Sequence, residues 1–145
     1  MMKITPFAAA MLIMIAALLN PISAWAQSSS PTTAIQRSVP RDAETQVFWS
    51  GNWRTLPPAA CAINFIPALT LVSPASHGTV RIGTAENTPR GSGCQNAITG
   101  AAIFYRPNPG FVGQDQFTFN LPGDPMARTW LGPPPGNRTV VITVH

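Results

Sequence analysis

The sequence predicts an all-β protein, a two-sheet β-sandwich of about seven short strands preceded by a secretory signal peptide. Three observations predict it: an apolar N-terminal segment, many prolines and glycines, and short stretches in which apolar and polar residues alternate. The chain has 145 residues, a length typical of one domain. Its 16 prolines and 11 glycines break helices, so they favour strands joined by turns over a helical bundle.

Residues 1–26 have the parts of a signal peptide. Lys3 supplies the positive start, and the apolar run that follows is shorter than a bilayer span. Ala24 and Ala26 are small residues at the positions a signal peptidase inspects, so we expect cleavage before Gln27. The alternative is an uncleaved membrane anchor. We expect a periplasmic or secreted protein whose mature form is soluble and has no membrane span, because no later apolar run is long enough.

Residues 27–43 are polar and contain proline, a composition typical of a flexible leader. The folded domain is therefore expected to comprise residues 44–145. Within it, about seven segments alternate with the two-residue period of half-buried strands, the pattern of a sandwich. Their apolar positions are Val47 and Trp49; Ile63 and Phe65; Leu69 and Leu71; Val80 and Ile82; Ile103 and Tyr105; Phe117, Phe119 and Leu121; and Val140, Ile142 and Val144.

The sequence contains two cysteines, Cys61 and Cys94. An exported chain with an even cysteine count normally forms disulfides, so we expect these two to be bonded to each other. Zinc binding is the weaker alternative, because zinc needs more ligands at short spacing.

One motif, within residues 74–119, is more specific than composition. It combines the turn Pro74–Val80 (PASHGTV) with Y-x-P-x-x-G-F-x-G-x-D-x-F, and its residues are Gly78, Tyr105, Pro107, Gly110, Phe111, Gly113, Asp115 and Phe117. This motif, followed by alternating valines near the C-terminus, resembles the cadherin-like, immunoglobulin-like repeat domains of bacterial surface and extracellular proteins. The resemblance implies an immunoglobulin-like sandwich. Those domains usually occur in tandem, whereas this sequence has a single copy.

The motif also has a physical interpretation of its own. Tyr105 ends a strand with its ring in the core, and the prolines stop further pairing. Gly110 and Gly113 supply positive φ angles that other residues avoid. Asp115 accepts hydrogen bonds from nearby turn amides. We therefore expect a structural corner rather than a site of chemistry.

Charge and catalytic motifs exclude several functions. The nine Lys+Arg against five Asp+Glu are scattered, which favours a mildly basic solvated surface over a nucleic-acid site. His77 and His145 lie in a turn and at the last position, and no G-x-S-x-G frames a serine, so we expect no enzyme and no cofactor. Calcium needs several carboxylates. Asp115 and Asp124 are the candidates, and we favour a structural role over a metal site.

The connection 122–138 is long for a compact domain, and such loops are often functional. Its candidate binding residues are Met126, Arg128, Trp130 and Leu131, because Trp and Arg are common at binding hot spots. The alternative is that Trp130 folds back to cap the sandwich. We expect an exported, non-enzymatic binding module of the cell envelope or exterior, whose partner is an envelope protein or a surface glycan. The alternative is a structural envelope component acting through self-assembly or edge-strand addition.

Overall fold

The structure is a computed structural model that describes residues 34–90, 93–126 and 134–145. The expected signal peptide, residues 1–26, lies outside these residues. The described chain folds into nine strands without a helix: β1 (Ile35–Val39), β2 (Thr45–Ser50), β3 (Asn52–Leu56), β4 (Ala60–Phe65), β5 (Thr70–Ser73), β6 (Gly78–Asn87), β7 (Ile98–Pro107), β8 (Gly113–Leu121) and β9 (Gly136–Val144). This confirms the all-β prediction. Nothing in the described ranges is a helix long and apolar enough to cross a membrane.

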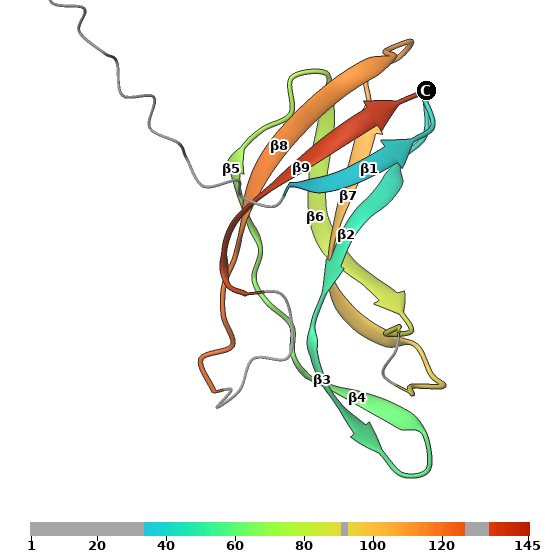
Figure 1. The fold of residues 1–145 in the computed structure, drawn as a ribbon, viewed down its shortest axis with the longest axis vertical. Helices are drawn as coiled ribbons and strands as arrows, with labels where there is room; N and C mark the ends of the chain where they lie inside the picture. Colours follow the sequence, from blue (N-terminus) through green and yellow to red (C-terminus); the bar gives the residue numbers. More distant parts are fainter. Residues whose placement is uncertain (1–33, 91–92, 127–133) are drawn as a thin grey trace, which may run out of the picture.

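The strands form three sheets. A four-stranded sheet has the order β1-β9-β8-β5, and a three-stranded sheet has the order β2-β7-β6. These two sheets pack together as a sandwich, whereas β3 and β4 form a separate hairpin that projects from one end (Figure 1). The C-terminus lies at the opposite end (Figure 1).

Strand β1 corrects the predicted domain boundary. Residues 27–43 were expected to be a flexible leader, but Ile35–Val39 pairs in parallel with β9 along its whole length. Val39 is fully buried, and the Arg37 Nε donates a hydrogen bond to the Val47 carbonyl of β2 over 2.7 Å. The leader assignment is therefore wrong for this part, and the folded domain includes β1.

The core lies between the two larger sheets. The expected alternation of buried and less buried residues holds over Phe117–Leu121 of β8 and Val140–Val144 of β9. In β7 it holds over Ile103–Tyr105, whereas Gly100–Ile103 are all buried. The fully buried large side chains include Ile103, Tyr105, Phe117, Phe119, Leu121, Val140 and Ile142. In β2 a register shift lies between Gln46 and Phe48, so Phe48 and Val47 are both buried while Trp49 stays half-buried. Val47 and Trp49 were predicted to share one face of the strand. Because of the bulge, Val47 is buried and Trp49 lies partly at the surface.

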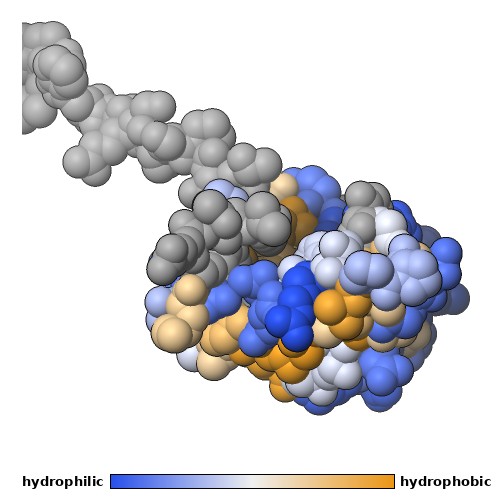
Figure 2. All heavy atoms as spheres, turned by 90° about the horizontal axis from the view of Figure 1, so that it is seen from below, coloured by the Kyte–Doolittle hydropathy of each residue, from blue (hydrophilic) through white to orange (hydrophobic). Residues whose placement is uncertain are grey.

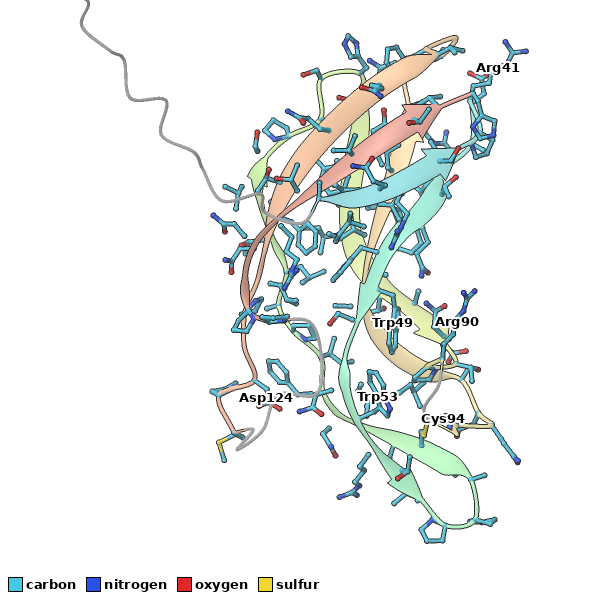
Figure 3. All side chains as sticks on the ribbon, in the orientation of Figure 1. Arg41, Trp49, Trp53, Arg90, Cys94 and Asp124 are labelled. Carbon is cyan, nitrogen blue, oxygen red and sulfur yellow. A yellow bond between two sulfur atoms is a disulfide. The ribbon has the colours of Figure 1, made fainter. Side chains whose placement is uncertain are left out.

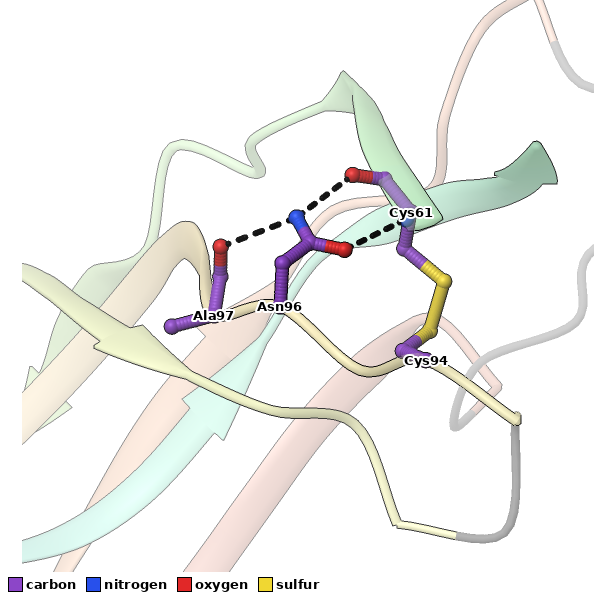
Figure 4. Close-up of a disulfide and its surroundings, with 4 residues drawn as sticks. All are labelled: Cys61, Cys94, Asn96 and Ala97. Carbon is purple, nitrogen blue, oxygen red and sulfur yellow. Dashed lines mark hydrogen bonds between the residues drawn. A yellow bond between two sulfur atoms is a disulfide. The ribbon is translucent and has the colours of Figure 1, made fainter. Parts of the chain in front are cut away.

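The hairpin β3–β4 is tied to the segment between β6 and β7. The predicted Cys61–Cys94 disulfide is confirmed, with Cα atoms 5.4 Å apart. The side chain of Asn96 adds to this link: it accepts a hydrogen bond from the Cys61 amide over 2.6 Å and donates one to the Cys61 carbonyl over 2.9 Å (Figure 4). The Gln95 amide also donates to the Ala59 carbonyl. This disulfide indicates that the protein folds in an oxidising compartment.

Candidate functional site

The motif around Asp115 forms a buried corner between the two sheets. Its carboxylate accepts hydrogen bonds from the backbone amides of Ser76, His77 and Gln116 over 3.0, 2.9 and 2.8 Å. The Tyr105 hydroxyl, from the opposite sheet, donates to the same carboxylate over 2.9 Å. Four donors therefore occupy one carboxylate, which ties the turn before β6 to β8.

These contacts set the protonation states of Asp115 and Tyr105. Burial alone would raise the pKa of Asp115, but the hydrogen bonds from Ser76, His77, Tyr105 and Gln116 outweigh it, so the pKa lies below its ordinary value. Burial, followed by the bond to Asp115 and its negative charge, raises the pKa of Tyr105. Asp115 is thus ionised and Tyr105 protonated at neutral pH.

Glycines make this corner possible. Gly110 and Gly113 have φ angles of 74° and 136°, in the region that favours glycine. A Cβ atom at Gly78 would lie 2.4 Å from the Tyr105 ring, so this strand residue is glycine because the ring packs against its backbone. The His77 imidazole stacks on the Phe111 ring, with centroids 4.4 Å apart and an 8° interplanar angle.

The corner places Ser76, His77 and Asp115 around a cavity of about 250 Å³. A catalytic triad would need the carboxylate to hold the imidazole, and the imidazole to contact a hydroxyl. Asp115 instead holds backbone amides and the Tyr105 hydroxyl. The geometry is that of a folding motif.

The long connection is described only at its two ends. Met126 is 88% exposed, whereas Arg128, Trp130 and Leu131 lie outside the described residues. The Asp124 carboxylate accepts a hydrogen bond from the Asn52 side chain over 2.8 Å, which attaches the connection to β3. Residues 34–90, 93–126 and 134–145 contain no group of three His, Cys, Asp or Glu side chains that could hold a metal ion.

A second hollow, larger than the cavity at the Asp115 corner, is a groove of about 750 Å³. It is bounded by β2 and the start of β3 on one side and by residues 87–90, at the end of β6, on the other. We call it the tryptophan groove and define it by Arg37, Gln46, Trp49, Trp53, Asn87 and Arg90. Figure 2 views the hairpin end of the molecule, where hydrophobic residues lie directly beside strongly hydrophilic ones.

Trp49 and Trp53 are the large aromatic residues of this groove. Their ring centroids are 6.0 Å apart and their planes are tilted by 45°. The Trp49 Nε1 donates to the Ala85 carbonyl over 2.9 Å. A Cβ atom at Gly100 would lie 2.4 Å from the Trp49 ring, so glycine lets the indole lie against β7. Figure 3 shows both tryptophans between the strands on the side where Arg90 lies. The ring of Trp49 is therefore fixed before any ligand arrives.

The charge of the groove is positive. Its lining includes Arg37 and Arg90 and no carboxylate. Arg37 is held in place by two carbonyl acceptors, Val47 and Gln36, which orient its guanidinium without neutralising it. Arg90 is exposed and forms no ion pair with any described residue.

Polar groups complete the lining. Gln46 and Asn87 present side-chain amides, which both donate and accept hydrogen bonds. Ser50 also borders the groove, and its Oγ is buried without a hydrogen-bond partner among the described residues. A buried hydroxyl without a partner costs free energy, so it calls for a water or ligand atom.

Sequence reasoning placed the binding residues in the connection 122–138 and missed this groove. One signal was present: two tryptophans four positions apart in a strand-forming stretch. The arginines could not be linked to them, because Arg37 lies in the supposed leader and Arg90 in a turn.

No family model matches the chain, and no curated protein or solved structure is similar to it.

Proposed function

We propose that this chain is an exported, non-enzymatic binding module of immunoglobulin-like, cadherin-like type, which acts in the periplasm or outside the cell. It binds a surface glycan through the tryptophan groove. The single observation that carries the proposal is the pair of tryptophans fixed beside amide and arginine side chains in one groove of about 750 Å³. That volume falls within the range of ligand sites, which is about 300–1,000 Å³.

The surroundings of the groove support binding by a preformed surface. The disulfide and Asn96 clamp the hairpin that carries Trp53, while Gly100 and Ala85 fix Trp49. A ligand then loses little affinity to the ordering of protein side chains. The motif of the Asp115 corner supports the immunoglobulin-like assignment, and the paired cysteines support an extracytoplasmic location.

Affinity electrophoresis tests the proposal. The exported protein is run through gels that contain polysaccharide isolated from the cell envelope, beside Trp53→Ala and Leu56→Ala. Leu56 lies on the same strand, is 38% exposed and does not line the groove, so it is the matched control. We expect retardation of wild type and Leu56→Ala but not of Trp53→Ala. Equal retardation of all three would contradict binding through the groove.

A second function is favoured by the sheet edges. Strand β6 is ten residues long and lies at the edge of its sheet, next to β7 alone among the described strands. A long edge strand can pair with another chain. The protein would then be a structural envelope component that assembles by strand addition. Light scattering over a range of concentrations separates the two functions, because assembly increases the mass and glycan binding by a monomer does not.

A further inference from the structure

We propose that the tryptophan groove is specific for an acidic sugar, a pyranose that carries a carboxylate within a polysaccharide. The proposal rests on the glycan-binding function above and adds the chemical class of the ligand. Three features carry it: the aromatic surfaces, the two arginines, and the blocked edge of β2.

The aromatic surfaces suit a sugar ring. A pyranose has an apolar face of C–H groups, and burying that face against an indole removes apolar surface of both partners from water. Gln46 and Asn87 offer amide donors and acceptors for the hydroxyls at the rim of the ring. The aliphatic and phenyl groups bordering the groove, Val47 and Phe48, are 1% and 7% exposed. They add little open apolar surface to that of the two tryptophans.

The arginines add a charge requirement. Arg37 and Arg90 line the same groove, and no carboxylate is among its lining residues. Glu44 pairs with Arg81, and Asp124 accepts a hydrogen bond from Asn52. A guanidinium binds a carboxylate through parallel hydrogen bonds in one plane. Arg37 already donates from Nε and Nη1, which leaves Nη2 to donate to a ligand. A neutral sugar would form no charge-paired hydrogen bond with either guanidinium.

Strand β2 does not offer its edge to a peptide here. The Val47 carbonyl, which an added strand would need, accepts the Arg37 Nε at 2.7 Å. Strand addition requires consecutive free backbone groups, so this edge is closed at the groove. An acidic peptide would have to bind by side chains alone.

The test is a calorimetric titration of the exported, disulfide-bonded protein with four probes. They are an oligogalacturonate, the methyl ester of the same oligosaccharide, a phosphorylated oligosaccharide of similar length, and polyglutamate. We expect the oligogalacturonate to bind at least about tenfold more tightly than the ester. A tenfold difference in Kd corresponds to about 1.4 kcal/mol in binding free energy. We also expect the affinity for the oligogalacturonate to fall as salt is added. The methyl ester keeps the ring and hydroxyls, so it isolates the charge.

Arg90→Gln provides the matched variant, because Arg90 is exposed and its loss leaves the core intact. It should weaken binding of the oligogalacturonate about tenfold and leave binding of the ester unchanged. Arg54→Gln, an exposed arginine on β3 outside the groove, should change neither.

The outcomes separate the two proposals. Equal affinities for acid and ester would overturn the acidic specificity and leave the glycan-binding function standing. Tighter binding of the phosphorylated probe would overturn the carboxylate assignment. Binding of polyglutamate as tight as that of the oligogalacturonate would overturn the sugar requirement. Failure of every probe, together with unchanged gel retardation in Trp53→Ala, would remove the binding function itself.

Discussion

At the scale of single residues, Asp115 accepts more hydrogen bonds than any other described carboxylate. Asp115→Ala would remove the carboxylate that accepts from the amides of Ser76, His77 and Gln116. The Tyr105 hydroxyl would keep only its longer bond, of 3.3 Å, to the His77 carbonyl. We expect a loss of about 1–3 kcal/mol in the free energy of unfolding. Denaturant melts measure it, with exposed Glu86→Ala as the control. The loss should be the same with calcium and with a chelator, and calcium-dependent stability that Asp115→Ala abolishes would contradict the structural role.

The lowered pKa of Asp115 makes stability depend on acid. Its unfolded pKa is about 3.9, and the folded value is lower. The stabilisation is therefore fully present above the unfolded pKa and is lost as the pH falls through the folded value. Between about pH 5 and pH 2 we expect wild type to lose more stability than Asp115→Asn, which has no charge to lose. Parallel melting curves across that range would speak against an ionised Asp115 in the folded state.

Most residues of the Asp115 corner could be predicted from the sequence, because Tyr105–Phe117 are close together along the chain and form one recognisable motif. Gly110 and Gly113 have the positive φ angles that the motif implies. The tryptophan groove could not be predicted from the sequence, since its residues come from separate segments that only the fold brings together. They include Arg37, Trp49, Trp53 and Arg90. Trp130 was a candidate binding residue because it lies in the long connection, with packing against the sandwich as the alternative. Trp49 was predicted only to share a strand face with Val47, and no role was predicted for Trp53.

At the scale of elements, β1 tests where the domain begins. A chain that starts at residue 44 would lose the pairing with β9 and the burial of Val39, which is fully buried. Burying one such side chain is worth about 1.5–3 kcal/mol. We expect this shorter chain to be destabilised by at least that amount, whereas a chain that starts at residue 34 should match the longer form in denaturant melts. Equal stability of the two truncations would show that β1 is dispensable.

The clamp on the hairpin is the second element to test. The bonded cysteines are 33 residues apart in sequence, and closing such a loop stabilises a fold by about 4 kcal/mol in the chain-entropy model. Reduction should therefore lower the melting temperature. Asn96→Ala, which keeps the disulfide but removes the bonds to Cys61, should weaken ligand binding with a smaller change in melting. Free thiols in the folded, exported protein would contradict the redox part of this prediction.

All seven predicted strands are present, but β1 and β3 were not predicted. β1 has apolar residues only at its two ends, with three exposed polar residues between them, so its sequence looks like a linker. β3 belongs to a two-stranded hairpin with little buried surface, and its apolar and polar residues do not mark one inner face. A strand with one buried face can be predicted from the alternation of apolar and polar residues in its sequence. A strand that is held mainly by pairing at a sheet edge lacks this alternation, so it is not predicted.

At the scale of the whole molecule, the predicted processing fixes the mass of the exported protein. Ala24 and Ala26 frame the predicted cleavage site, so the protein recovered from periplasm or medium should begin at Gln27. Intact-mass measurement decides this directly. A mass that includes residues 1–26 would show that the segment is retained, as a membrane anchor would be.

The packing of Trp49 against Trp53 gives the folded molecule an optical signature. The two indoles are 6.0 Å apart with their planes at 45°, which is close enough for their electronic transitions to couple. Coupled transitions of tilted chromophores split the far-ultraviolet circular dichroism into bands of opposite sign. This couplet reports on the contact between the sandwich and the hairpin, since β2 carries one indole and β3 the other. Its disappearance while the sheet signal persists would mark a partly unfolded state in which the sandwich survives and the groove has come apart.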